Sequence, residues 1–357
     1  AYEIPKRDWS SDVCSSDLGI YYFKSWDIFK ECYRNSHDEF NLLGEQYVSL
    51  LFNAAISRKF SVSHFEATKF VCLGTPEDYE EYMYWRSFFN AMKESDSSSE
   101  RFPGTKLIPM AGSGERFSKN GIKVPKAFIP VRDKPMFIHS LLSTPIMEKN
   151  LLIVMDSLLD RTKNGVDRFG IAANISTLFN KTSGPGETIL KVRNDIVLNE
   201  PVMIMSCDYE QQIETSTFRD ITSSNEYCAG VFYTNFSRFR MKTPEAFAYA
   251  MIDDSFSVRK IVEKELLTQM PERDALLVGT FWFESGRLLL EMLESARKQQ
   301  RLVNGELYVA NAMNMLIENG LKVFALPTKS WVSYGDPDEL EIYQWWEDLF
   351  QIGRAHV

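Results

Sequence analysis

The chain has 357 residues, of which 44% are apolar, so it is long enough for about two globular domains with hydrophobic cores. Its formal net charge of −9 excludes nucleic acid as the main partner, because neutralising a phosphate backbone requires a basic surface. No apolar run approaches the roughly 20 residues of a membrane span, so no membrane-spanning segment is expected.

The cysteines of the chain show no disulfide pattern. There are five of them, without a C-x-x-C pair and without the density of a disulfide framework. This usage predicts reduced thiols, which are typical of a cytoplasmic enzyme.

The two ends of the chain are related through their codons. One codon choice for Asp12–Asp17 is GAC GTG TGC TCT TCC GAT, and its reverse complement, ATC GGA AGA GCA CAC GTC, translates as Ile352–Val357. Two copies of one sequencing-library adapter in opposite orientation would produce this relation. We therefore interpret residues 1–18 and 351–357 as adapter-derived and omit them from the expected fold. A natural but unusual N-terminus is the alternative.

A long internal repeat organises the rest of the chain. Three early segments match three late ones at an offset of 260 or 261 residues: Gly19–Ser25 with Gly279–Ser285, Gly44–Val48 with Gly305–Val309, and Phe70–Trp85 with Trp331–Trp346. A period this long indicates a duplicated domain. We predict the C-terminal part of a truncated first domain at 19–92, a Ser-rich linker at 93–104 and a complete second domain at 105–350.

The second domain alternates buried strands with helices. Strands are expected at Lys106–Met110, at 151–156 and at 201–208, and the last two end at an Asp. Helices are expected at 166–179 and 287–300. This order predicts an α/β fold of Rossmann-like type, with a mixed, mostly parallel sheet flanked by helices and ligands at the carboxyl ends of the strands.

The loop after the first of these strands carries the most informative pattern. Gly112 and Gly114 leave backbone N–H groups free to approach a phosphate. Arg116 can clamp phosphate oxygens with its planar guanidinium, and Pro125-Lys126 adds a second cation. Together these residues predict a site for a phosphorylated ligand.

The stretch from Pro109 to Met136 resembles the signature of the sugar-phosphate nucleotidyltransferases (nucleotide-sugar pyrophosphorylases), G-x-G-x-R-[LF]…PK followed by P-V-x-x-K-P-M. The resemblance covers residues 105–350 in order and the tail of a second such domain in 19–93. The closing "LGTPEDYEEY" is similar to members from capsule and surface-polysaccharide pathways. The resemblance implies the nucleotide-diphospho-sugar transferase fold. It also implies a Mg²⁺-dependent reaction of a nucleoside triphosphate with a sugar 1-phosphate, which gives a nucleotide-sugar and pyrophosphate for glycan biosynthesis.

The resemblance also implies roles for particular residues. Arg116 would hold the departing pyrophosphate, Lys126 the α-phosphate and Asp208 the Mg²⁺. The nucleotide would be bound by Ala111, Gly112, Gly114, Gly184 and Glu187, and the sugar by Glu263, Lys264, Gly279 and Glu306. Thr182–Thr188 lacks the Gln that often reads the base, so the nucleotide remains open between CTP, UTP, GTP and dTTP.

Simpler readings of these residues remain open. Asp208 is also a natural strand-end turn residue, Glu263 and Lys264 also suit a solvated face, and Glu306 also suits a helix cap. Ser333 stands where many family members have a second metal-binding Asp, and Asp336 is a candidate replacement.

Two other functions are kept as alternatives. One is a cytidylyltransferase for a polyol or choline phosphate, because the early motif is shared. The other is a catalytically weak nucleotide-sugar sensor, because Ser333 replaces a carboxylate. The apolar face with Trp345, Trp346 and Phe350 predicts core or an interface, so a homo-oligomer is also left open.

Overall fold

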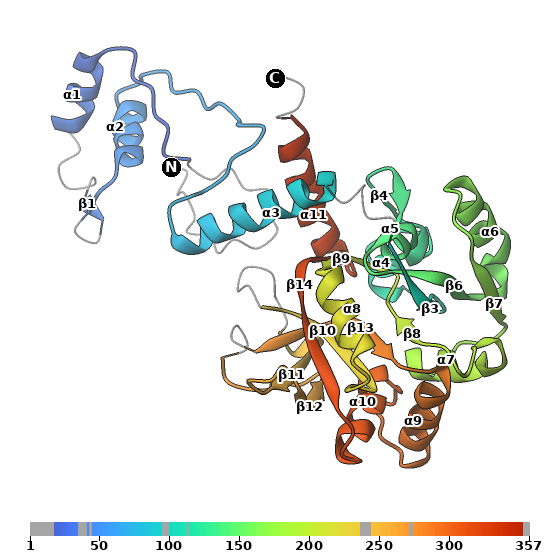
Figure 1. Ribbon diagram of the computed structural model, residues 1–357. Coiled ribbons are helices and arrows are strands. Elements are labelled where there is room, and N and C mark those ends of the chain that lie inside the picture. Colours follow the sequence, from blue (N-terminus) through green and yellow to red (C-terminus); the bar gives the residue numbers. More distant parts are fainter. Residues whose placement is uncertain are drawn as a thin grey trace. The chain divides into compact units, whose positions relative to one another are not determined.

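The computed structural model describes residues 18–34, 41–42, 45–94, 100–112, 114–235, 244–270 and 274–352 (Figure 1). Both predicted adapter segments lie outside these ranges apart from Leu18, Gln351 and Ile352. The chain divides into two compact units, Ala1–Leu73 and Gly74–Val357.

The second unit is built on a ten-stranded mixed sheet with the order β7-β6-β3-β8-β13-β10-β14-β9 and with β11 and β12 attached beside β13. Its strands are β3 (Arg101–Pro109), β6 (Ile146–Met155), β7 (Asn174–Leu178), β8 (Val202–Ile204), β9 (Tyr209–Ile213), β10 (Ala229–Asn235), β11 (Ala248–Ile252), β12 (Val258–Glu263), β13 (Ala275–Phe283) and β14 (Val323–Ser333). The first four strands in this order are parallel, whereas β13 runs antiparallel to both of its neighbours, β8 and β10. A separate two-stranded ribbon joins β4 (Pro130–Val131) to β5 (Lys134–Pro135).

Helices cover both faces of this sheet. They are α3 (Pro76–Glu94), α4 (Glu115–Lys119), α5 (Met136–Leu142), α6 (Leu159–Arg168), α7 (Pro185–Lys191), α8 (Thr215–Ser223), α9 (Gly286–Lys298), α10 (Val309–Glu318) and α11 (Pro337–Ile352). One core contains Leu107 together with residues of α7, α9 and α10, and the other contains Ile108 with residues of α5, α6 and α8. Successive residues of β3 therefore lie in opposite cores, which is the pattern of a sheet buried on both faces. This architecture confirms the predicted α/β class.

Two local predictions are wrong. Residues 166–179 do not form one helix, because α6 ends at Arg168 and β7 begins at Asn174. Gly170 adopts a φ of 64°, and the N–H of Ile171 turns back to the Val166 carbonyl, so the chain leaves the helix there. The predicted linker is also too long: α3 continues to Glu94 and β3 already begins at Arg101, while residues 95–99 lie outside the described part.

The first unit contains a small helix pair. Its elements are α1 (Trp26–Arg34), β1 (Asn41–Leu42), β2 (Glu45–Gln46), the short 3-10 helix Val48–Leu50 and α2 (Leu51–Ser57). The buried core is Cys32, Leu51, Ala54 and Ala55, against which Phe23, Ile28 and Phe29 pack. The Ser25 hydroxyl accepts the Ile28 N–H at 3.3 Å, as the Ser285 hydroxyl accepts the Leu288 N–H at 3.2 Å at the start of α9. The repeat thus carries the same helix cap twice.

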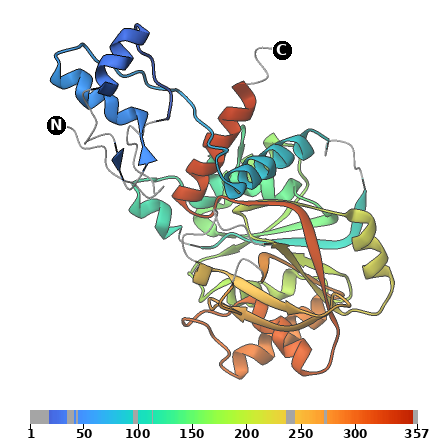
Figure 2. The ribbon, with the colours of Figure 1, turned by 90° about the vertical axis from the view of Figure 1, so that its left-hand side faces the viewer.

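Helix α3 lies in the second unit, although the sequence assigns it to the first domain. It packs against α11, the helix that contains most of the late copy of the repeated motif (Figure 2). The Trp85 and Trp346 rings stack with centroids 6.0 Å apart. Early and late copies of one motif therefore meet in a single hydrophobic cluster.

The cysteines of the described part, Cys32, Cys72, Cys207 and Cys228, form no disulfide there. Of the helices in the described ranges, none has the length and apolar character needed to cross a bilayer.

Candidate active site

The loop after β3 brings Gly114 against Lys126. Gly114 has a φ of 62° and stands before the first residue of α4. A Cβ on Gly114 would lie 3.0 Å from the Lys126 Cβ, so glycine is required both for the backbone conformation and for the close approach. Gly112 faces open space, and Ser113 lies outside the described residues. The loop thus places Lys126 beside an open backbone surface.

Lys126 and Asp208 form the central ion pair of the site. The Lys126 Nζ contacts Asp208 Oδ2, and the Ser206 hydroxyl donates to Asp208 Oδ1. Burial by itself would raise the pKa of Asp208, but the Lys126 ammonium and the Ser206 hydroxyl outweigh it and hold that pKa below its usual value. Burial likewise opposes the charge on Lys126, and the Asp208 carboxylate nevertheless raises the Lys126 pKa. Both groups are therefore charged at neutral pH.

The end of β14 forms one wall beside Asp208. The Tyr334 N–H donates to the Asp208 carbonyl at 3.0 Å, and a Cβ on Gly335 would lie 2.9 Å from Asp208 Oδ2. Glu339 Oε2 accepts both the Ser333 hydroxyl at 2.7 Å and the Gly335 N–H at 2.8 Å. Ser333, where the family pattern expects an Asp, thus serves to hold Glu339.

Arg116 reaches the same wall from α4. Its guanidinium lies 3.8 Å from Asp336 Oδ2, and its side chain is 64% exposed. An exposed pair at this distance contributes little to stability, so the guanidinium is free to bind an anion. Asp336, the candidate replacement for the missing metal ligand, faces Arg116 instead.

Three of the four predicted sugar-binding residues, Glu263, Lys264 and Glu306, lie around Tyr308. Its hydroxyl donates to Glu306, and the Lys264 ammonium lies 5.8 Å from the centroid of its ring. Lys264 adopts a φ of 59°, unusual for a side-chain-bearing residue, and its ammonium donates to the Ala246 carbonyl. Glu263 ends β12, and its burial, together with the Glu306 charge, raises its pKa to about 7 despite Lys264. The pair Glu263 and Lys264 is therefore not a solvated face.

Glu306 is not a helix cap. The N-terminus of α10 is capped by Asn311, whose side chain accepts the Tyr308 N–H at 2.9 Å. Glu306 instead faces the Tyr308 hydroxyl and influences Glu263. This leaves its carboxylate available for a substrate hydroxyl.

The segment around Gly184 packs against Glu306 and Leu307. Gly184 has a φ of 96°, and a Cβ there would lie 3.0 Å from the Glu306 Cβ. The Leu307 N–H donates to the Ser183 carbonyl at 2.8 Å. The predicted nucleotide and sugar segments are thus joined directly.

The remaining predicted residues have mainly local contacts. Glu187 lies 3.8 Å from Lys191 on α7, and Ala111 is buried in the core that contains Leu107. Gly279 has a φ of 83°, and a Cβ there would lie 3.5 Å from the Tyr209 ring. Nothing in these contacts assigns Glu187 a direct role.

The residues present fit a metal ion held mainly by substrate. In the described part of the chain, no cluster of three or more His, Cys, Asp or Glu side chains is arranged as a metal site. Mg²⁺ commonly takes one or two carboxylates and completes its shell with phosphate oxygens and water. Asp208 supplies one carboxylate beside the loop that is predicted to bind phosphate, so it fits this mode and not an all-protein cage.

Sequence reasoning missed three residues of the site: Ser206, Tyr308 and Glu339. Glu339 had a detectable signal, because Asp78 occupies the matching place in the early motif. Tyr308 and Ser206 each lie only two residues from the carboxylates that they contact, Glu306 and Asp208, so this spacing was visible in the sequence but was not used.

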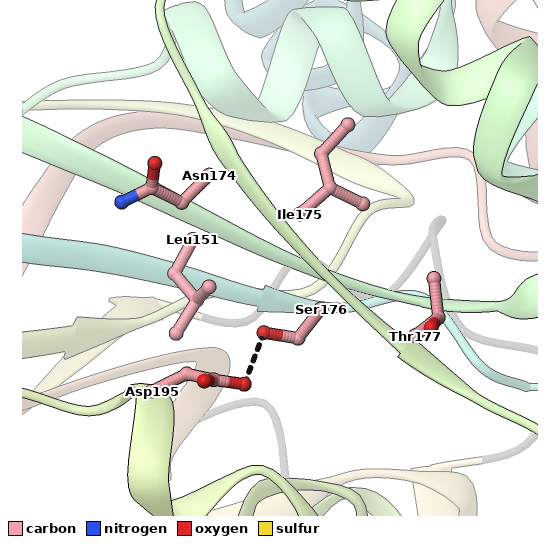
Figure 3. Close-up of a pocket in the computed structure, with 6 residues that line it drawn as sticks. All are labelled: Leu151, Asn174, Ile175, Ser176, Thr177 and Asp195. Carbon is pink, nitrogen blue, oxygen red and sulfur yellow. Dashed lines mark hydrogen bonds between the residues drawn. The ribbon is translucent and has the colours of Figure 1, made fainter.

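A shallow hollow of about 480 Å³ lies elsewhere, along β6 and β7 (Figure 3). It is lined by Leu151, Asn174, Ile175, Ser176, Thr177 and Asp195. The Ser176 hydroxyl donates to Asp195 at 2.7 Å, and no residue of the predicted site borders the hollow.

Comparison with solved structures decides the fold family. The chain superposes on the nucleoside-diphosphate-sugar pyrophosphorylase of Vibrio cholerae RC9 with a TM-score of 0.55 and 22% identity, covering 67% of this chain and 98% of that one. A UDP-glucose pyrophosphorylase complexed with UDP-glucose gives a TM-score of 0.56 and 16% identity, with coverages of 70% and 99%. The inositol-1-phosphate CTP transferase of T. maritima gives 0.54 and 14%, with coverages of 69% and 97%. The fold is that of the nucleotidyltransferases.

No protein-family model and no curated protein matches the sequence. The nucleotidyltransferase fold is therefore established by three-dimensional similarity at low identity. It confirms the fold that the loop signature implied, and the roles of individual residues remain predictions.

Proposed function

We propose that the chain transfers a nucleotidyl group from a nucleoside triphosphate to a sugar 1-phosphate, forming a nucleotide-sugar and pyrophosphate. One observation carries the proposal: Gly114, Lys126 and Asp208 meet at the carboxyl ends of β3 and β8. This is where α/β sheets bind ligands, and the three residues combine an open backbone, a cation and a carboxylate. The resemblance to the capsule and surface-polysaccharide subgroup suggests polysaccharide biosynthesis as the use of the product.

The proposed reaction is an in-line displacement at the α-phosphorus, and each residue of the site has its own role in it. A phosphate oxygen of the sugar 1-phosphate attacks the α-phosphorus, and the bond from that phosphorus to the bridging oxygen of the pyrophosphate breaks. Lys126 neutralises charge on the α-phosphate and Arg116 binds the departing pyrophosphate. Bound Mg²⁺ at Asp208 would supply further charge neutralisation on the triphosphate. No proton transfer is required, because the attacking oxygen is already ionised.

The acceptor sugar would lie against Glu263, Glu306 and Tyr308. Glu306 and the ionised form of Glu263 accept hydrogen bonds from hydroxyl groups, and an aromatic ring suits the apolar face of a sugar. Lys264, beside the same ring, would contact the acceptor phosphate.

Cytidylyl transfer to a polyol or choline phosphate is the second candidate. It is favoured by the comparable structural similarity to the inositol-1-phosphate CTP transferase of T. maritima. The two candidates share the phosphate site and differ only in the acceptor.

The test is pyrophosphate release with Mg²⁺, measured for CTP, UTP, GTP and dTTP against a panel of sugar 1-phosphates, inositol 1-phosphate and choline phosphate. We expect release with at least one sugar 1-phosphate and none after chelation with EDTA. Release with CTP and inositol 1-phosphate or choline phosphate alone would select the second candidate. Nucleotide binding without turnover on any acceptor would contradict both and indicate a nucleotide-sugar sensor.

A further inference from the structure

Helices α3 and α11 pack reciprocally. Residues of α11 match residues of α3 at an offset of 261, so that Trp346 matches Trp85 and Phe350 matches Phe89. Matching residues face each other: the Trp85 and Trp346 centroids are 6.0 Å apart, and those of Phe89 and Phe350 are 5.5 Å apart. Tyr82 matches Tyr343, and the two reciprocal contacts have nearly equal lengths. The ring centroids are 5.8 Å apart for Tyr82 and Phe350 and 5.7 Å apart for Phe89 and Tyr343. Such a self-complementary contact is typical of a twofold interface between two copies of one unit.

Tyr84 departs from this symmetry, since Trp345 occupies its place in α11. The Tyr84 hydroxyl donates to the Trp331 carbonyl and accepts the Trp331 N–H at 3.3 Å. A single hydroxyl thus binds both backbone groups of one residue in β14.

Trp331 needs such a partner because of its place in the sheet. The pairing of β14 with β10 ends at Pro327. Beyond it β14 pairs with β9 on one side, and in the described structure no strand pairs with its other side. Trp331 is only 8% exposed, so an unpaired backbone N–H or C=O there would be costly. Tyr84 replaces the missing strand at this point.

The residues that follow Trp331 in the chain lie at the candidate site. Two residues after Trp331, Ser333 holds Glu339. The next residue, Tyr334, donates its N–H to the Asp208 carbonyl, and Gly335 lies against the Asp208 carboxylate. A displacement of the Trp331 backbone would therefore move the wall that positions Asp208.

We propose that Tyr84 is a positioning residue, through which the early copy of the repeat fixes the Trp331–Gly335 wall of the Asp208 site in the late copy. Its effect on turnover rests on the proposed function, whereas its effect on the wall does not. Loss of the hydroxyl should reduce kcat and leave the KM for the acceptor nearly unchanged, because Glu263 and Glu306 lie on other segments. Hydrogen exchange of the wall should accelerate in parallel.

The test compares Tyr84→Phe with Tyr79→Phe in the full chain. Tyr84→Phe removes only the hydroxyl and keeps the ring beside Trp85, at 5.7 Å between centroids. Tyr79 lies on the same helix, is 54% exposed and serves as the matched control. For Tyr84→Phe we expect about tenfold faster amide exchange at Trp331 and about tenfold lower kcat, with the acceptor KM within about twofold of wild type.

Equal exchange at Trp331 in the two variants would overturn the proposal. So would faster exchange with an unchanged kcat, or a rise in the acceptor KM as large as the fall in kcat, because either result would indicate a purely structural role. If the wild-type chain releases no pyrophosphate with any acceptor, the proposed function fails separately. Exchange at Trp331 then still decides whether Tyr84 fixes the wall.

Discussion

The two copies of the repeat form the same helices but not the same strands. In the early copy, α1 and α2 occupy the positions that match α9 and α10, and the caps at Ser25 and Ser285 are alike. The early segments that match β13 and β14, within residues 18–23 and 62–72, contain no strand in the described structure. Helical hydrogen bonds are local, whereas a strand requires a neighbour, so one sequence pattern yields a helix readily and a strand only in a sheet.

The closing motif shows a second contrast. In the late copy it borders Asp208 and carries Ser333, Gly335 and Glu339. In the early copy Thr75 and Asp78 form the same reciprocal helix cap at 3.1 Å, and the helix that follows serves as packing and support. A repeated motif can thus keep its structural role while only one copy stands at a site.

The largest effect is expected at Lys126. Lys126→Ala should reduce the pyrophosphate-release rate at least about 100-fold, because it removes charge stabilisation of the α-phosphate and leaves Asp208 without its cation. The matched control is Cys72→Ala, since Cys72 occupies the early position that corresponds to Ser333. A comparable loss of the pyrophosphate-release rate in both variants would contradict the conclusion that only the late copy stands at the site.

The reciprocal helix pair can be tested by a double-mutant cycle. Trp85→Ala and Trp346→Ala should each lower the free energy of unfolding by about 3 kcal/mol, because both rings are buried. Their effects should be non-additive by about 1 kcal/mol in urea unfolding, since the rings stack on each other. Tyr79→Ala combined with Trp346→Ala is the control cycle and should be additive. Additivity in both cycles would remove the evidence for a coupled interface.

A pH dependence of stability is expected in the late copy at Glu263. Its folded-state pKa of about 7 lies above the ordinary 4.5, so the folded chain binds more protons than the unfolded chain between these values. The contribution of Glu263 to the free energy of unfolding should therefore fall by about 1–2 kcal/mol as the pH rises from 4.5 to 7. Glu263→Gln should remove this fall and exceed wild type in thermal stability at pH 8. The exposed neighbour Glu265, changed to Gln, should leave the profile unchanged.

The smallest effect concerns the two helix caps. Asp78→Ala and Glu339→Ala should each cost about 1 kcal/mol of stability in thermal unfolding, because each removes the same kind of cap. Only Glu339→Ala should also lower turnover, by about threefold or more, since Glu339 also holds Gly335 beside Asp208. Equal turnover in the two variants would show that the wall does not depend on this carboxylate.

Much of the site could be read from the chain because its residues follow strand ends. Gly114, Lys126 and Asp208 were expected together, and the structure joins them. Asp336, the candidate replacement for the second metal ligand, lies 3.8 Å from Arg116, and Glu339 accepts the Gly335 N–H. The positions of these side chains depend on the pairing of β14 with β9, which cannot be read from the sequence around either strand.

The sequence by itself determined the α/β class and shows the repeated segments, and it predicts a phosphate-binding loop, because apolar periodicity, repeated motifs and glycine spacing can be read from neighbouring residues. Only the tertiary structure decided that α3 belongs with the late copy, that residues 174–178 become an edge strand, and that Tyr84 meets Trp331 across 247 positions of chain. The physical reason is that these outcomes depend on burial and on backbone hydrogen bonds between distant segments, which exist only once the sheet has formed.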